Sequence, residues 1–250
     1  MWADDQHLTG RFLQVDEHDF CRRLSRVVAA RADRSWVDAV QAQERQLRRQ
    51  LPVALADVEF DGAAVADVVA GLPAETHLFV GNSLPIRHVD QFGLPRRERL
   101  HVYANRGASG IDGNISTGLG IAAAHDRPVV MVLGDITFYH DMNGLLAVRA
   151  QGLTPVIVLL NNDGGGIFQR LPIAAHDPPF TDLFRTPHGL DFAPAAEMYG
   201  LEYMLVADRP ELREMLADAL QNPRPIIIEY RSDSAADEAV RQQIKLEQNG

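Results

Sequence analysis

The chain has 250 residues, of which 46% are hydrophobic and 23% charged, and its formal net charge is −10. This composition is typical of a globular domain with a buried core, and the negative charge argues against a surface for nucleic acid or anionic lipid. Cys21 is the only cysteine, which excludes an internal disulfide and a cysteine zinc site, and a single lysine, Lys245, argues against Schiff-base or P-loop chemistry. Since no signal region or long apolar run is present, we expect a soluble, cytoplasmic protein without a membrane span.

Residues 17–51 predict two helices. Phe20 and Leu24 belong to the apolar stripe of the first, and Trp36 to that of the second. Nothing in this stretch suggests chemistry. We interpret residues 1–54 as the helical end of a larger domain.

From residue 55 onward, short apolar runs alternate with helix-like segments, one of which covers 141–151. The runs are HLFV (77–80), HVYA (101–104), PVVMVL (128–133), PVIVLL (155–160), EYMLV (202–206) and PIIIEY (225–230). Continuous runs without period-two alternation are typical of strands buried on both faces. The pattern predicts an α/β fold with a doubly wound, mostly parallel six-stranded sheet over residues 55–232. The polar tail 233–250 is expected to be a loose helix or a frayed end.

Polar and glycine-rich segments follow four of these runs. They read GNS (81–83), NRGASGIDGN (105–114), GD (134–135) and NNDGGG (161–166). In a parallel sheet, ligands bind at the carboxyl ends of the strands, so this edge is predicted to form the functional site.

Asp135 and Asn162 follow two successive runs and offer hard oxygen ligands that suit Mg²⁺. Because Mg²⁺ takes its remaining ligands from phosphate and water, such a pair predicts a phosphate-bearing cofactor. Gly134 permits a close turn, and the amides of Ile136 and Thr137 would face a diphosphate. From chemistry alone, an ordinary role of Asp135 and Asn162 as turn and cap residues is equally consistent with the sequence.

The glycines of the NNDGGG segment would let the chain wrap closely around a metal ion. Among them, Gly164 would offer its carbonyl oxygen as a third ligand.

Four longer strings narrow the interpretation. They are FVGNSLPIR (79–87), NRGASGIDG (105–113), LGDITFYHDMNGLL (133–146) and LLNNDGGGIFQRLP (159–172). Asn162 follows Asp135 by 27 residues, a spacing that resembles the GD…N signature of thiamine-diphosphate enzymes. Over roughly residues 55–230 the strings resemble one branch, the 2-succinyl-5-enolpyruvyl-6-hydroxy-3-cyclohexene-1-carboxylate (SEPHCHC) synthases of menaquinone biosynthesis. Residues 1–52 resemble only the end of the central domain of that family.

The resemblance implies a transferase that decarboxylates 2-oxoglutarate on thiamine diphosphate and adds the succinyl carbanion equivalent to isochorismate. By motif position, Asp135, Asn162 and the carbonyl of Gly164 would hold Mg²⁺ or Mn²⁺. Gly110 and Ile111 in the ASGIDG loop would contact the cofactor, with Ile111 as a stiff wedge that keeps it bent. Taken alone, Ile111 is an ordinary core contact.

The same resemblance implies a substrate-binding surface. Ser83, Arg87 and Arg106 would face the substrates, because guanidinium groups pair bidentately with dicarboxylates. Taken alone, both arginines are more typical of solvated surface charges.

An apolar wall near the reacting carbon would be formed by Ile167, Phe168 and Leu171, and Ile167 would also contact the cofactor. On their own, these three residues would be interpreted as core residues.

The family activates its cofactor with a glutamate from an N-terminal pyrimidine-binding domain, and no glutamate of this chain stands in a matching motif. The resemblance therefore implies a pyrimidine-binding domain from another chain or from a missing N-terminal region, and a homo-oligomer. Two alternatives stay open: another thiamine-diphosphate carboligase or decarboxylase of the acetolactate synthase type, and a non-catalytic cofactor-binding subunit.

Overall fold

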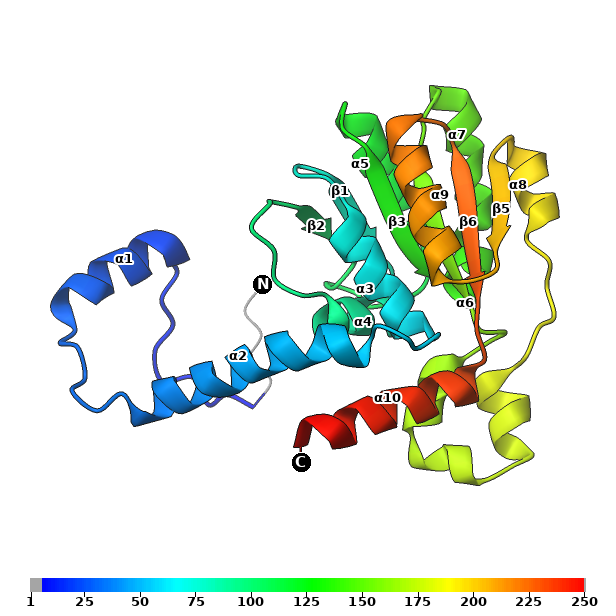
Figure 1. The fold of residues 1–250 in the computed structure, drawn as a ribbon. Helices are drawn as coiled ribbons and strands as arrows, with labels where there is room; N and C mark the ends of the chain where they lie inside the picture. The colour runs from blue at the N-terminus through cyan, green and yellow to red at the C-terminus, as the bar shows by residue number, and fades with distance from the viewer. Residues whose placement is uncertain (1–5, 250) are drawn as a thin grey trace. The chain divides into compact units, whose positions relative to one another are not determined.

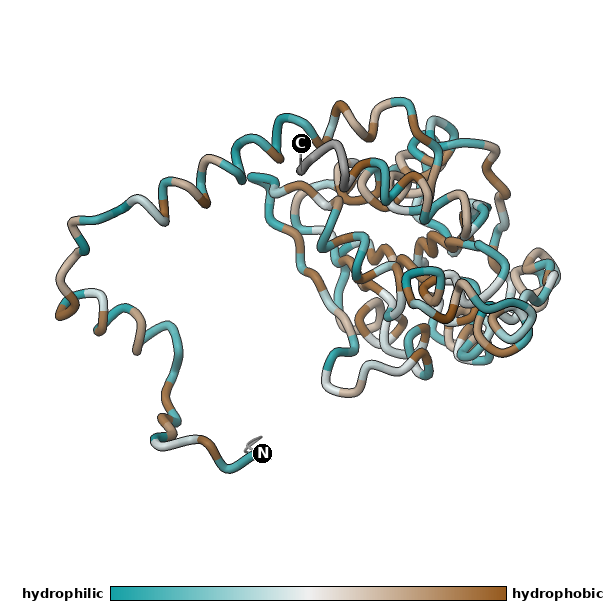
Figure 2. Tube along the Cα trace, turned by 90° about the horizontal axis from the view of Figure 1, so that it is seen from below, coloured by the Kyte–Doolittle hydropathy of each residue, from teal (hydrophilic) through white to brown (hydrophobic). Residues whose placement is uncertain are grey.

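A computed structural model describes residues 6–249, which form two compact units divided between residues 46 and 47. The first unit contains helix α1 (Glu17–Val27) and the beginning of α2 (Ser35–Ala54), which are the two helices predicted there. Along this stretch hydrophilic and hydrophobic residues alternate (Figure 2). The predicted segments 1–54 and 233–250 include residues 1–5 and 250, which lie outside the described residues. The division of the chain at residues 54 and 233 therefore stays a prediction. The side chain of the single lysine, Lys245, also lies outside the described part.

The second unit is built on six parallel strands, so the predicted sheet is confirmed (Figure 1). The strands are β1 (His77–Val80), β2 (His101–Tyr103), β3 (Val129–Gly134), β4 (Val156–Asn161), β5 (Glu202–Val206) and β6 (Ile226–Arg231). Their spatial order is β2-β1-β3-β4-β6-β5. The central strands β1, β3 and β4 place their carboxyl ends side by side, which brings three of the predicted loops to one edge of the sheet.

Helices cover both faces of the sheet (Figure 1). One face carries α3 (Asp61–Gly71), α4 (Leu84–Phe92) and α9 (Arg209–Gln221); the other carries α5 (Asn114–Ala124), α6 (Asp135–Asp141), α7 (Leu146–Gln151) and α8 (Ala193–Tyr199). The side chains alternate between the two faces: Val130 and Val132 pack toward α3 and α9, whereas Met131 and Leu133 pack toward α5. The four inner strands, β1, β3, β4 and β6, therefore belong to two hydrophobic layers each, which explains why their sequences are almost continuously apolar. The outer strands β2 and β5 are partly exposed, contrary to the prediction of burial on both faces.

Two helical regions differ from the sequence prediction. Helix α3 was not predicted, because its residues are apolar on nearly every side and show no helical stripe. The predicted helix-like segment 141–151 is helical, but it consists of a 3-10 turn (Met142–Leu145) followed by α7. The helix before it, α6, begins directly at Asp135 and was not predicted. The side chain of Asp141 accepts a hydrogen bond from the backbone N–H of Ser116 in α5 (2.8 Å), which ties the end of α6 to a neighbouring helix.

Three short helical turns and one long helix complete the chain. They are η2 (Gly166–Arg170), η3 (Pro172–Ala175), η4 (Thr181–Arg185) and α10 (Ser234–Asn249). Helix α10 is anchored by Ile244, which is buried in the hydrophobic cluster of α2 and α3.

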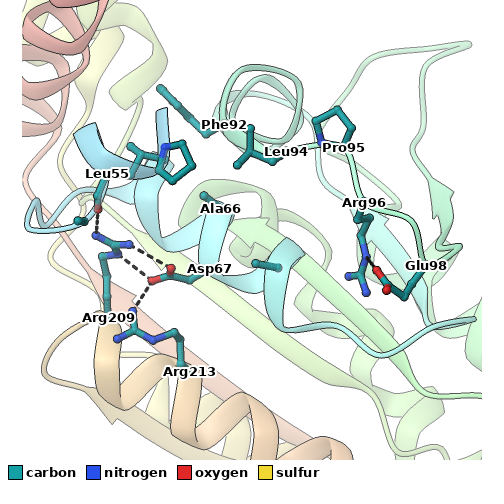
Figure 3. Close-up of a pocket in the computed structure, with 13 residues that line it drawn as sticks. Leu55, Ala66, Asp67, Phe92, Leu94, Pro95, Arg96, Glu98, Arg209 and Arg213 are labelled. Atoms are coloured by element: carbon teal, nitrogen blue, oxygen red, sulfur yellow. Dashed lines mark hydrogen bonds and ion pairs between the residues drawn. The ribbon is translucent and has the colours of Figure 1, made fainter. Parts of the chain in front are cut away.

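Arg209 connects α9 to α3 through a buried ion pair (Figure 3). Its guanidinium group donates two hydrogen bonds to Asp67, with distances of 2.8 and 3.0 Å, and two more to the carbonyl oxygens of Leu55 and Val58. Arg213 adds a bond to Asp67 from a half-exposed position. Each of the three guanidinium nitrogens of Arg209 thus donates at least one hydrogen bond inside the protein.

We expect Arg209→Ala to lower the free energy of unfolding by about 3 kcal/mol. The substitution leaves the carbonyl groups of Leu55 and Val58 without their donor, and Asp67 keeps only its half-exposed partner Arg213. Urea denaturation of the two proteins measures the difference. The control, Arg213→Ala, removes the exposed partner of the same carboxylate and should cost less than about 1 kcal/mol. Equal effects of the two substitutions would contradict this account.

Candidate functional site

A cavity of roughly 180 Å³ lies at the carboxyl ends of β1, β3 and β4. Most of the predicted site residues line it: Ser83, Ile111, Gly134, Asp135, Ile136, Thr137, Asn162, Gly164, Ile167 and Phe168. They come from four separate segments of the chain, which the parallel sheet brings to one place.

Asp135 is the first residue of α6 and is almost completely buried. Its Oδ1 accepts a hydrogen bond from the N–H of Ile136 (2.7 Å), and its Oδ2 accepts one from the N–H of Gly164 (2.9 Å). Burial raises the pKa of this carboxyl group, although these hydrogen bonds oppose the shift. The ionised form would therefore be favoured by a cation at this position.

The side chain of Asn162 places an amide oxygen in the same cavity as the carboxylate of Asp135. Its Oδ1 is buried and has no hydrogen-bond partner among the described residues, which is an unfavourable state for a polar atom unless a ligand satisfies it. A Cβ atom at Gly166 would lie 2.6 Å from the Asn162 amide nitrogen, so a glycine is required for this approach. Between residues 6 and 249, no group of three or more His, Cys, Asp or Glu side chains is arranged to hold a metal ion. A cation here would depend on the mixed set of carboxylate, amide and main-chain oxygens.

Gly164 has a φ of +129°, and a Cβ atom there would lie 2.1 Å from the carbonyl oxygen of Arg185. Its own carbonyl oxygen accepts a hydrogen bond from the N–H of Gly166 (2.9 Å) and retains a second lone pair. Both the backbone conformation and the available space therefore demand glycine.

His188 is a neighbour of Asp135 that the sequence did not reveal. Its Nε2 lies 3.2 Å from Asp135 Oδ2, while its Nδ1 accepts a hydrogen bond from the N–H of Leu190 (2.9 Å). Since Nδ1 accepts, the neutral ring carries its proton on Nε2 and donates to the carboxylate. The residue belongs to a loop 53 positions further along the chain, and no local motif marks it.

Asn82 holds the loop that carries Arg106. Its side-chain amide donates to the carbonyl oxygens of Asn105 (3.0 Å) and Gly110 (2.6 Å), and its Oδ1 accepts a bond from Arg106 (2.7 Å). It lies within the predicted GNS segment, but its role is visible only once the loops are folded together.

Four predicted residues lie outside the lining of the cavity: Arg87, Arg106, Gly110 and Leu171. Arg87 is exposed on α4 and donates to the carbonyl oxygen of Ser83 (2.6 Å). Leu171 is 47% exposed. Phe184, which was not predicted, lines the cavity and packs edge-on against Phe168, with ring centroids 5.6 Å apart.

Ser83 has a backbone conformation that non-glycine residues rarely adopt, with φ 73° and ψ −130°. It precedes Leu84 and Pro85, which also line the cavity. A strained residue at a cavity wall is a common feature of binding sites.

A second cavity, of about 520 Å³, lies between α3, α9 and the segment after α4 (Figure 3). Its charged groups pair with one another, as in Asp67 with Arg209 and Arg96 with Glu98. None of the predicted site residues lines it. It is therefore a weaker candidate than the smaller cavity at the strand ends.

The fold and the loops at its edge define the class of protein. Residues 87–230 match the family described as thiamine pyrophosphate enzyme, C-terminal TPP binding domain, and the chain belongs to this family. More narrowly, it is 53% identical over 243 residues to a SEPHCHC synthase of Roseiflexus sp., and 50% identical over 185 residues to one of Haloarcula marismortui. The resemblance to SEPHCHC synthases is confirmed.

These relatives are much longer than the chain. The alignment covers 96% of the chain but 42% of the Roseiflexus protein, and 74% of the chain but 31% of the Haloarcula protein. The chain thus spans less than half the length of the curated relatives that it matches.

Solved structures share the fold. A benzoylformate decarboxylase from Polynucleobacter necessarius superimposes with a TM-score of 0.57 over 70% of this chain and 33% of that chain, at 18% identity. A putative thiamin diphosphate-dependent enzyme from Mycobacterium smegmatis gives a TM-score of 0.55 over 70% and 32%, at 19% identity. No helix within the described residues is long and apolar enough to cross a membrane.

We expect Gly164→Ala to lower the free energy of unfolding of the domain by about 1–3 kcal/mol. Alanine would be strained at this φ, and its Cβ atom would collide with the backbone of Arg185. Thermal unfolding measures the change. Gly107→Ala is the matched control, since a Cβ atom at that exposed glycine meets nothing within 4 Å. A Gly164→Ala protein as stable as the control would show that the loop relaxes freely.

Proposed function

We propose that the chain is the cofactor-anchoring part of a thiamine-diphosphate-dependent transferase that decarboxylates 2-oxoglutarate and joins the succinyl unit to isochorismate. The observation that carries this proposal is the unpartnered amide oxygen of Asn162, buried in the same cavity as the carboxylate of Asp135. The names of the relatives state the product, and the two proposed substrates fit that product.

The proposed metal ligands are Asp135, Asn162 and the carbonyl oxygen of Gly164, with Mg²⁺ as the ion and Mn²⁺ as an alternative. The donor set fits, because it combines one carboxylate with two neutral oxygens and leaves positions for phosphate and water. When bound, thiamine diphosphate supplies the carbanion-stabilising chemistry. The N–H groups of Ile136 and Thr137 would bind its diphosphate.

The remaining cofactor contacts would be made by small and apolar groups. Gly134 and Gly110 allow the loops to approach the cofactor, and Ile111 and Ile167 would hold its ring systems in place. Both isoleucines are half-buried. Apolar contacts of this kind fix the orientation of a bound cofactor.

The substrate side would be formed by Ser83, Phe168 and Leu171, together with Arg87 and Arg106. The two guanidinium groups would bind the carboxylates of both substrates. Each is tied by one hydrogen bond to the GNS segment and retains further N–H donors.

Activation of the cofactor would need an acid from outside the chain. We therefore propose a pyrimidine-binding domain as partner, contributed by another chain or by a further N-terminal region, within a cytoplasmic homo-oligomer. Residues 1–54 would end a central domain, and residues 55–232 would be the cofactor domain.

We expect Asp135→Ala to lower Mg²⁺-dependent affinity for thiamine diphosphate by more than about 100-fold, since even outer-shell partners of metal sites are worth 10–100-fold. Calorimetric titration with and without Mg²⁺, repeated with the pyrimidine-binding domain present, measures the affinity. Asp90→Ala is the control, because Asp90 is an exposed carboxylate on α4. Unchanged Mg²⁺-dependent binding in the Asp135→Ala protein would refute the metal assignment.

The double substitution Arg87→Ala and Arg106→Ala should raise the KM for 2-oxoglutarate by roughly 100-fold or more, because each charged hydrogen bond lost is worth about 1.5–3 kcal/mol. Steady-state kinetics of the assembled enzyme measure it, and binding of thiamine diphosphate should not change. An enzyme of the acetolactate synthase type has no dicarboxylate substrate. Its turnover of pyruvate would therefore survive the double substitution, and this result would contradict the assigned substrates.

A further inference from the structure

A cluster of buried ionisable groups lies directly behind the cavity. Asp61 is the first residue of α3 and is 2% exposed, and it lines the functional cavity together with Ser83 and Phe168. It also lines a second, very small cavity of about 10 Å³, close to the volume that one water molecule needs. Asp61 thus forms the wall between the functional cavity and this water-sized space.

The partner of Asp61 is His88, on the next helix. His88 is 1% exposed, and its Nε2 lies 3.0 Å from Asp61 Oδ2. This is an ion-pair distance, but the pair lacks the angles of a hydrogen bond, and neither ring nitrogen has another partner among the described residues. On its other sides the imidazole meets the rings of Phe60 and Phe92. A proton shared by these two side chains is thus shielded from bulk solvent except through the functional cavity and the water-sized space.

A second carboxylate completes the cluster. Asp237 of α10 is 7% exposed, and it accepts hydrogen bonds from the N–H of Asp61 (3.3 Å) and from the hydroxyl of Ser232 (2.6 Å). Burial raises the pKa of Asp237 above its usual range, which favours the protonated, neutral carboxyl group.

Further charged side chains surround these three groups. Arg170 of η2 and Glu238 and Arg241 of α10 line the small cavity, and Asp233 adds negative charge near Asp237. Arg170 and Glu238 form an ion pair at 3.7 Å, and Arg241 pairs with Glu238. Glu238 is thus shared by the two arginines. Arginines do not lose their protons at ordinary pH, so Asp61 and His88 are the groups placed to exchange a proton.

The proposed reaction consumes one proton, so a source is needed; the inference rests on the proposed function. When 2-oxoglutarate loses CO₂, the freed electron pair forms a carbon–carbon bond to C2 of isochorismate. The π electrons of its C1=C2 bond move to C1, the carbon that bears the carboxylate. One proton must then be added at C1, and this leaves the single ring double bond named in 3-cyclohexene-1-carboxylate. No oxidant or reductant is required.

We infer that Asp61 supplies the proton taken up in this addition step and that His88, in contact with it, returns the proton to Asp61. The carboxyl group of Asp61 is part of the cavity wall, and His88 is the proton donor within reach on its far side. Asp237 is a positioning residue, because it holds the backbone of Asp61 and remains neutral. A purely structural role for the cluster, in which Asp237 caps α3 and His88 ties α4 to α3, is the alternative to be tested.

The test is a single-turnover experiment on the assembled enzyme, with pyrimidine-binding domain, thiamine diphosphate and Mg²⁺ present. The release of CO₂ and the formation of the carbon–carbon product are followed separately. In Asp61→Asn, CO₂ release should stay within roughly three-fold of the unmodified enzyme, whereas product formation should fall by about 100-fold or more, the usual contribution of a general acid. Asp90→Asn should change neither rate.

Two further variants separate the roles. His88→Gln should slow product formation by about 10-fold or more and alter its pH profile, because Asp61 then regains its proton from water alone. Asp237→Asn retains an acceptor for the Asp61 N–H and fixes a neutral side chain, so its product formation at pH 7 should match that of the unmodified enzyme.

Two results would overturn the inference. Product formation at the normal rate in Asp61→Asn would exclude Asp61 as the donor, and an equal loss of CO₂ release and product would assign it a structural role. Failure of the proposed function looks different: the unmodified enzyme would then release no CO₂ from 2-oxoglutarate, and the inference would fall with it.

Discussion

Asp135 is a carboxylate held almost entirely out of water at the end of a fully buried strand, and the arrangement of the cavity follows from that burial. A buried carboxylate needs donors and positive charge around it. Here the donors are the backbone N–H groups of Ile136 and Gly164 and the ring of His188, which come from three different segments. Each segment is positioned by its bond to this one side chain, so the loop after β4 and the loop before α8 are both fixed with respect to the end of β3.

The parallel sheet makes this convergence possible. Because β1, β3 and β4 run in the same direction, the segments that follow them meet at one edge even though they are distant in sequence. The close approach of the chain then requires glycines, as at Gly164 and Gly166, where a single added carbon atom would collide with backbone or with Asn162. The parallel topology thus brings the loops together, and the small size of glycine then allows them to pack tightly.

Much of this arrangement could be predicted from the sequence, for definite physical reasons. Strands buried on both faces are continuously apolar, and the loops after them are rich in glycine and asparagine, so both signals are local and strong. Helix α3 carries no such signal, because it too is buried on almost every side. His188 and Asp61 belong to segments without a motif, and they reach the cavity only through tertiary folding. The exposure of Leu171 likewise depends on the path of a loop, which a short apolar string does not specify.

The conformation of Ser83 has a consequence for the history of the fold. At its φ of 73° a glycine would fold with less strain, yet the chain retains a side chain with a hydroxyl group there. Under the proposed function this hydroxyl group faces a ligand, so a change to glycine would exchange a ligand contact for stability. Laboratory evolution for heat resistance alone would therefore favour glycine at this position, and the accompanying loss of binding would measure the contribution of the hydroxyl group.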